Sequence, residues 1–299
     1  MRADRCGVRS LILRILPLLC LFLLVGCGSS AEKAGTAGDG PGKRNEWFYN
    51  SFDIRQKSVY DAFRASAEDP FGQQMMPVTD EIGAQDGLPV RDIDTVYQGF
   101  LYDHPEMFWL GQSYSYRLSG TGENGETADA VAVIPIPETE EELAGLREEF
   151  EVSAARIIEK TGDADSDEEY ARAVYELLAS ETEYTGEAVY DDTMHLQHTA
   201  YGAIAEKKAV CDGFALAYKY LLSAKGITCL VVPGASEGNP HTWNIAEWDG
   251  RWHEADLTWD ASLGNAGGSQ YFDLTTAEMQ KDHTRESEGI AALIPVTDD

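Results

Sequence analysis

Basic residues are scarce in this chain of 299 residues, which has 23 Lys and Arg against 52 Asp and Glu and a formal charge of −29. A surface of this sign repels nucleic-acid phosphates and anionic lipid headgroups. The composition therefore argues against nucleic acid as a partner and against membrane adsorption by charge alone. A solubilising surface is the simplest interpretation, and a preference for basic polypeptide substrates is a weaker alternative.

Metal and phosphate motifs are also missing. The sequence has no CxxC pair, no HExxH, no EF-hand loop and no glycine-rich phosphate loop. We therefore expect neither a metal nor a nucleotide or other cofactor. Hydrophobic content of 43% and charged content of 25% are typical of a soluble globular protein with a full core.

The N-terminal apolar run, Ile15 to Val25, is 11 residues long. That length is too short to cross a hydrocarbon core of about 30 Å comfortably. Four arginines lie before or within the start of this region, at positions 2, 5, 9 and 14. A basic segment followed by a short apolar run is typical of an export signal, and we assign residues 1–26 to it.

The apolar run ends in Leu24-Val25-Gly26-Cys27, which resembles a bacterial lipobox. The resemblance implies cleavage before Cys27, lipidation of its sulfur, and an anchored protein on the extracytoplasmic face of the cell membrane. Two acyl chains on Cys27 are sufficient for stable anchoring. Residues 27–45 are small, polar and glycine-rich, as expected of a flexible tether. The alternative is an ordinary signal peptide in which Cys27 is incidental.

Of five cysteines, only Cys211 and Cys229 remain after the signal peptide and Cys27 are set aside. A helix starting at Cys211 and a strand returning through Cys229 would leave their Cα atoms ~14 Å apart. A disulfide requires Cα atoms within about 7 Å. We therefore predict that Cys211 is a free thiol and Cys229 a buried apolar residue.

Helical and strand periodicities alternate from Trp47 onward, which predicts an α+β fold. Residues 46–160 carry no catalytic constellation, and we assign them to an N-terminal α+β accessory region. Residues 161–299 form the predicted catalytic domain. The expected elements are helices at 59–63, 93–101 and 139–160, strands at 114–118 and 130–136, a helix capped by Ser166, and a helix from Cys211 that ends at Gly226.

Cys211 is therefore predicted at a helix N-terminus. The positive end of the helix dipole and its unpaired backbone amides favour a thiolate there. The same amides could stabilise an oxyanion on an attacked carbonyl.

A hairpin brings a histidine and an acid together. The Asp249-Gly250 pair is a strong hairpin signal, and a two-residue loop there places Trp243 opposite Asp256. His241 then lies on the same face as Asp256, with Cβ atoms ~7 Å apart or slightly less. In contrast, His253 faces the other side without an acidic partner in this register. Asp260 is predicted to bind backbone in a turn, and Glu254 shares the face of Asp256 with poorer geometry.

These residues closely resemble the transglutaminase-like superfamily. The resemblance is carried by Cys211-x-Gly213-Phe214-Ala215, Gly226-Ile227-x-Cys229, His241-x-Trp243-Asn244, Asp256-x-Thr258-Trp259-Asp260, Gln197-x3-Tyr201-Gly202, Tyr271-Phe272-Asp273-Leu274 and Met279-x3-His283.

The resemblance implies a papain-like α+β core, with the cysteine helix packed on an antiparallel sheet, and a catalytic triad of Cys211, His241 and Asp256. Gln197 is a possible oxyanion donor by analogy with papain-like enzymes. Thr242 and His253 depart from the common family pattern, which has alanine and tyrosine there.

The predicted function is an enzyme acting on amide bonds of a protein or peptide substrate through an acyl-enzyme. Release to water would make it a cysteine peptidase or deamidase, and release to an amine would make it a transglutaminase. Hydrolysis is favoured, because bacterial members resemble proteases more often. The alternatives are a catalytically silent surface binding module on the same scaffold and, fitting less well, a cell-wall amidase.

Overall fold

The computed structural model describes residues 46–72, 74–78, 88–122, 125–189, 191, 193–262 and 269–297. The predicted signal peptide, Cys27 and the tether lie outside these residues. Within them, no helix combines the length and apolar character needed to span a bilayer.

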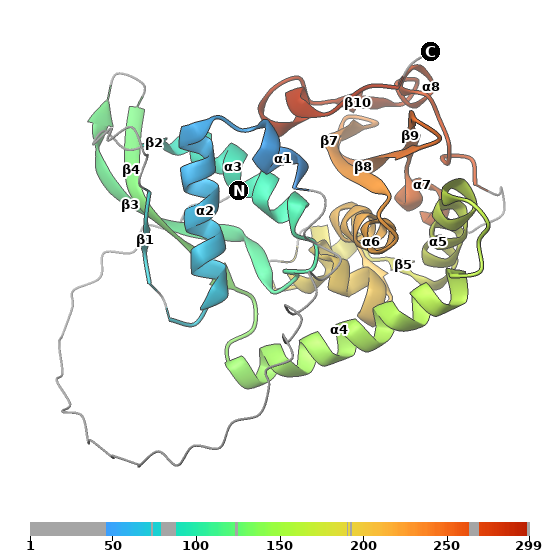
Figure 1. Ribbon diagram of the computed structural model, residues 1–299, viewed down its shortest axis with the longest axis horizontal. Helices are drawn as coiled ribbons and strands as arrows, with labels where there is room; N and C mark the ends of the chain where they lie inside the picture. Colours follow the sequence, from blue (N-terminus) through green and yellow to red (C-terminus); the bar gives the residue numbers. More distant parts are fainter. Residues whose placement is uncertain are drawn as a thin grey trace, which may run out of the picture.

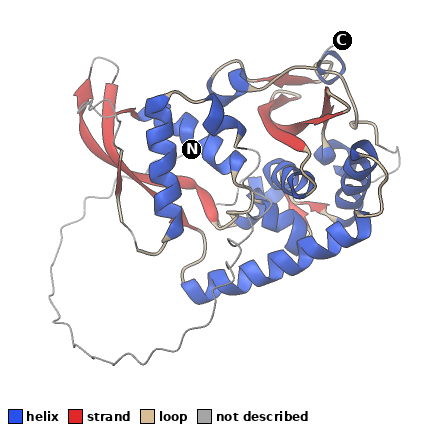
Figure 2. Cartoon of the chain, in the orientation of Figure 1, coloured by secondary structure: helices blue, strands red, loops and turns tan. Residues whose placement is uncertain are grey.

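The first part of the chain builds a sheet covered by helices (Figures 1 and 2). Two short strands, β1 and β2, and the longer β3 all pair with β4 in antiparallel fashion. Helix α2 packs on β4 and on α3. The bounds are α1 (Trp47–Ser51), α2 (Ile54–Glu68), β1 (Met76–Pro77), β2 (Leu88–Pro89), α3 (Val90–Asp103), β3 (Leu110–Gly122) and β4 (Gly125–Pro135).

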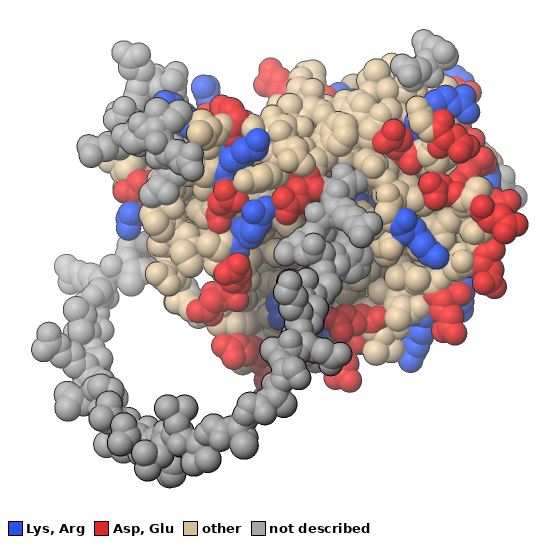
Figure 3. Space-filling model, in the orientation of Figure 1, with Lys and Arg blue, Asp and Glu red and all other residues tan. Residues whose placement is uncertain are grey.

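Two acidic helices follow; the first begins next to its predicted start at residue 139, and the second begins at the cap predicted at Ser166. Thr139 caps α4 (Glu140–Thr161) by accepting from the amide of Glu142, and Ser166 caps α5 (Asp167–Glu181) by accepting from that of Glu169. In Figure 1, α4 runs along the lower edge of the molecule. Acidic side chains outnumber basic ones on the face drawn in Figure 3, consistent with the charge of the chain.

The second sheet has the order β10-β7-β8-β9, with all pairs antiparallel. Helix α6 packs on β7 and β8 on one side and on α5 on the other. The bounds are β5 (Glu183–Tyr184), η2 (Gly186–Val189), η3 (Leu196–His198), the π-helix η4 (Gly202–Glu206), β6 (Lys208–Ala209), α6 (Cys211–Ala224), β7 (Thr228–Ser236), β8 (Asn239–Trp248), β9 (Arg251–Ala255), α7 (Leu257–Ser262), α8 (Thr276–Met279), β10 (His283–Arg285) and η5 (Gly289–Leu293).

The β8–β9 hairpin has the predicted register. Trp248 pairs with Arg251, and Asn244 pairs with Ala255. Asp249 and Gly250 have φ values of 53° and 73°, so both occupy the left-handed region that the tight turn requires. The predicted α+β fold, with a cysteine-bearing helix on an antiparallel sheet, is confirmed.

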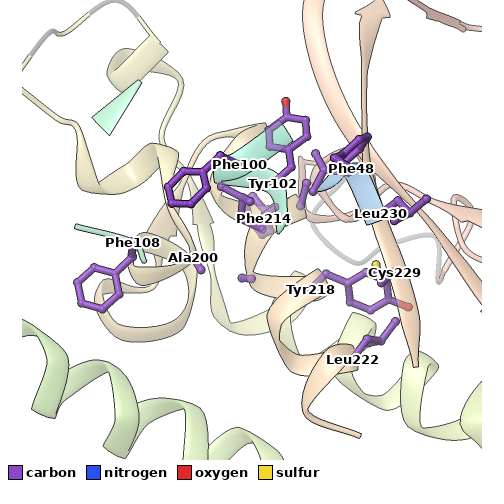
Figure 4. Packing of buried hydrophobic residues seen from close by; sticks show 14 of the residues in the cluster. Phe48, Phe100, Tyr102, Phe108, Ala200, Phe214, Tyr218, Leu222, Cys229 and Leu230 are labelled. Atoms are coloured by element: carbon purple, nitrogen blue, oxygen red, sulfur yellow. The ribbon is translucent and has the colours of Figure 1, made fainter. Parts of the chain in front are cut away.

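One hydrophobic cluster runs through both parts of the chain. Figure 4 shows Phe100 and Tyr102 of α3 in the same region of the core as Phe214 of α6. The ring of Phe108 packs 5.0 Å from that of Tyr201, between the two parts. The predicted boundaries between residues 26 and 27, 45 and 46, and 160 and 161 stay predictions.

Candidate active site

Cys211 is the first residue of α6, as predicted, and it is partly exposed. The segment before the helix passes close against its first turn. A Cβ atom at Gly213 would lie 2.4 Å from the backbone oxygen of Gln197 and 3.0 Å from that of Thr199. Only glycine leaves room for this approach, which fixes where the helix starts and therefore where the sulfur lies. Cys229 is free and fully buried, and burial raises the pKa of its thiol to about 12.

His241 lies between the thiol and an acid. Its Nε2 is 2.7 Å from Oδ2 of Asp256, and Cys211 is near enough to contribute to the raised pKa of its imidazole. Because Nε2 serves the carboxylate, Nδ1 is the nitrogen left for the sulfur. Burial lowers the pKa of His241, but the charge and hydrogen bond of Asp256, together with Cys211, outweigh it and raise that pKa to about 10.

Asp256 follows the last residue of β9 and is fully buried. Its Oδ1 accepts from the backbone amides of Thr258 at 2.9 Å and Trp259 at 3.3 Å, in the first turn of α7. Burial opposes ionisation, but His241 and then His283 lower the pKa of Asp256 to about 2. The carboxylate is therefore charged at neutral pH and held in one orientation. The structure thus brings together the three residues predicted for the triad.

Sequence reasoning missed the role of His283 at this acid. The Nε2 of His283 lies 2.9 Å from the same Oδ2 of Asp256, and its Nδ1 lies 2.6 Å from Oδ1 of Asp282. In the sequence, His283 stands out only as part of the C-terminal Met279-x3-His283 motif. Its position depends on the pairing of β10 with β7, for which no local pattern in the sequence gives a signal.

A second unpredicted network surrounds Asp212, the residue after Cys211. Its Oδ1 accepts from Oγ1 of Thr242 at 2.9 Å, and Oδ2 accepts from Nε2 of Gln112 at 3.0 Å. Nδ1 of His198 lies 3.3 Å from Oδ2. Because Thr242 follows His241 in the chain, the contact joins the cysteine helix directly to the histidine strand. Gln112 adds a contact from the N-terminal region.

The remaining polar residues near the hairpin have structural partners. His253 stacks on Trp248 at 4.1 Å and contacts Asp273 at 2.6 Å. Glu254 accepts from the indole of Trp243 at 2.6 Å. Asp260 accepts from the backbone amides of Gln270 and Tyr271 and from the hydroxyl of Tyr175.

The side-chain amide of Gln197, considered above as an oxyanion donor, is bound to another side chain. The Nε2 group donates to Glu206, and the backbone oxygen of Gln197 accepts from Val210 at 3.1 Å. In this arrangement Gln197 supports the segment below Cys211. The first-turn amides of α6 lie nearer to Cys211 in the sequence.

His241, Asp256 and His283 are also the kinds of side chain that bind metals, with donor atoms within 4.8 Å of one another. Their separations of 2.7 and 2.9 Å are those of hydrogen bonds. Two ligands of a tetrahedral zinc ion with bonds of 2.0–2.1 Å lie about 3.3 Å apart. The cluster therefore fits a hydrogen-bonded chain better than a metal site.

Residues 154–257 match the family model described as the transglutaminase-like superfamily, which confirms the resemblance drawn from the sequence. Among curated proteins, 149 residues are 28% identical to kyphoscoliosis peptidase of Mus musculus, covering 42% of this chain and 22% of that protein. The Homo sapiens protein of the same name is 27% identical over 139 residues, covering 39% of this chain and 21% of that protein. The matched stretch spans about a fifth of the length of these relatives.

Solved structures are similar at a lower level. A TGase crystal structure has 17% identity and a TM-score of 0.37, with 57% of this chain and 49% of that chain covered. A protein of Cytophaga hutchinsonii described as a candidate cysteine protease has 14% identity and a TM-score of 0.33, with 58% and 60% covered.

Proposed function

We propose that this chain, with its transglutaminase-like segment at residues 154–257, is a membrane-anchored extracytoplasmic thiol enzyme that acts on amide bonds of proteins or peptides. The observation that carries the proposal is the position of His241 between Cys211 and Asp256. A partly exposed sulfur, a partly buried imidazole and a fully buried acid are the components of a base-activated thiol nucleophile.

In the proposed reaction, the Cys211 thiolate attacks the carbonyl carbon of the substrate amide. The amine leaves with the proton that His241 held, and a thioester remains on Cys211. His241, now neutral, takes a proton from water as that water attacks the thioester, and the acid and free thiol are released. Asp256 orients the imidazole throughout, because its own orientation is set by the amides of Thr258 and Trp259.

Hydrolysis is proposed over amine transfer. The two curated relatives are called peptidases, and this supports water as the acceptor. Transfer to a lysine amine uses the same thioester, so the triad alone does not distinguish the two reactions.

Thiol activation is tested first, by the rate at which iodoacetamide labels Cys211 in the full chain at pH 6, read from the Cys211 peptide by mass spectrometry. We expect labelling far faster than that of an unperturbed thiol, and loss of the excess in His241→Ala. His195→Ala, at an exposed histidine, is the matched control and should label like wild type. Equal rates in wild type and His241→Ala would contradict the proposal.

The acceptor is tested with casein and a fluorescent primary amine. Hydrolysis predicts new casein fragments without incorporated fluorescent amine. With Cys211→Ala we expect neither fragments nor incorporated amine. Incorporation of the amine without fragments would replace hydrolysis by transfer.

Anchoring is a separate proposal that rests on Cys27. We expect radiolabelled palmitate to be incorporated into the wild-type chain expressed in a bacterium, and the protein to sediment with membranes. Cys27→Ala should lose both properties. Retention of the label in that variant would contradict lipidation at Cys27.

A further inference from the structure

His283 lies between two carboxylates in the interior of the protein. Its side chain has no exposed surface, its Nε2 is 2.9 Å from Asp256, and its Nδ1 is 2.6 Å from Asp282. The hydroxyl of Tyr271 donates to the other oxygen of Asp282 at 2.8 Å. An ionised carboxylate only accepts hydrogen bonds, so each ring nitrogen of His283 must carry a proton. The ring is then an imidazolium cation.

Aromatic rings surround this cation. The centroids of Trp243, Trp259 and Tyr271 lie 5.1, 5.2 and 5.8 Å from that of His283, and the ring of His241 lies at 5.4 Å. Charges interact more strongly in such an apolar enclosure than in water. The charge of His283 therefore acts strongly on Asp256 and on His241.

Gly234 allows the enclosure to form. It lies on β7 opposite His241 of β8 and Arg285 of β10. A Cβ atom at this position would lie 2.3 Å from the backbone oxygen of Thr284 and 2.6 Å from the ring of Trp243. Because glycine has no Cβ atom, β10 and Trp243 can pack closely around His283.

We infer that His283 is a positioning residue, a buried cation that holds the Asp256 carboxylate and offsets its charge, so that His241 releases its proton more readily than it would beside Asp256 alone. The inference rests on the proposed function for its catalytic meaning. Two imidazoles share one carboxylate oxygen, and a second acid, Asp282, keeps one of them, His283, in its cationic form. Asp256 therefore orients His241 but attracts the positive charge of protonated His241 less strongly than it would without His283.

The directions of the pKa shifts support this arrangement. Burial lowers the pKa of His283, but Asp256 and Asp282 outweigh burial and raise it, while the charge of His241 acts in the opposite direction. His241 has a raised pKa even with His283 present, and a further rise would prevent it from accepting a proton from water. The titratable groups facing the pair are Asp256, Asp282, Tyr271 and, through His241, Cys211.

The test follows the protonation of both histidines by NMR of the full chain carrying ¹⁵N-labelled histidine, which needs no substrate. In wild type we expect His283 to remain an imidazolium above the pH at which a free imidazole loses its proton. In His283→Gln, loss of the neighbouring cation should raise the pH at which His241 titrates by about one to two units. His253→Gln is the matched control, because His253, on β9 of the same sheet, also contacts an acid, Asp273, but does not touch Asp256. It should leave the titration of His241 unchanged.

Asp282→Asn provides a second route if His283→Gln does not fold. This variant removes one of the two acids, so the pKa of His283 should fall and the titration of His241 should move upward. A neutral His283 in wild type, or an unmoved His241 in either folded variant, would overturn the inference. If the NMR results hold and Cys211 still reacts like an ordinary thiol, the charge arrangement is correct and the proposed function fails.

Discussion

Thr242→Val should weaken the link between the cysteine helix and the histidine strand. The substitution keeps the shape of a side chain that is 7% exposed and removes the hydroxyl that donates to Asp212 at 2.9 Å. A hydrogen bond to a charged group contributes about 1.5–3 kcal/mol. Asp212 is partly exposed and keeps Gln112 and His198 as partners, so we expect about 1–2 kcal/mol. For a protein of this size the melting temperature should fall by roughly 2–8 °C.

The same substitution should slow the alkylation of Cys211 at pH 6. If about 1 kcal/mol of the bond serves to hold His241 against the sulfur, the excess rate should fall about fivefold. Thr242→Ser keeps the hydroxyl and should retain the wild-type rate, although it loses a buried methyl group and some stability. The reasoning is refuted if Thr242→Val melts at a lower temperature and still labels like wild type, because the contact would then stabilise the fold without positioning the site.

Further predictions concern the acid, the imidazole and the start of α6. The pKa of Asp256 is lowered from an ordinary value near 3.9 to about 2. The interactions of its carboxylate with His241 and His283 therefore contribute about 2–3 kcal/mol to the free energy of unfolding, which is present above pH ~4 and lost as the pH falls toward 2. Urea unfolding at pH 2.5 and 5 should show this loss in wild type and much less of it in Asp256→Asn. The raised pKa of His241, about 10, means that its contribution is present below pH ~6.5 and declines as the pH rises toward 10, so the same measurements at pH 6 and 10 should differ less in His241→Ala. Gly213→Ala should destabilise the protein by about 1–3 kcal/mol because its Cβ meets backbone, whereas Gly145→Ala in α4, with nothing within 4 Å, should be neutral or stabilising; equal melting temperatures for these two variants would contradict the packing argument.

Local signals explain which parts of the fold were predictable. Thr139 and Ser166 cap the helices that follow them, and the Asp249-Gly250 turn determines the register that brings His241 to Asp256. Each of these depends on residues close together in the chain, where backbone geometry and side-chain periodicity limit the possible structures.

The contacts that escaped prediction join distant segments. Asp212 receives groups from β3, η3 and β8, and His283 reaches Asp256 only after β10 has paired with β7. No short pattern specifies such pairings, because they depend on how completed elements pack. Gln197 shows the same limit, since its partner Glu206 is set by the π-helix η4, which has no recognised signature in this sequence.

The continuity of the core has a practical consequence for anyone who would graft or exchange parts of this protein. The indole of Trp47 donates to the backbone of Leu293 at 2.9 Å, Phe108 packs on Tyr201, and Gln112 reaches Asp212. A fragment beginning at residue 161 would expose the face of Tyr201 that packs on Phe108 and would remove Gln112, one of the groups that hold Asp212 in place. Residues 46–160 therefore pack as part of the same core as the residues around Cys211, and chimaeras should carry both together.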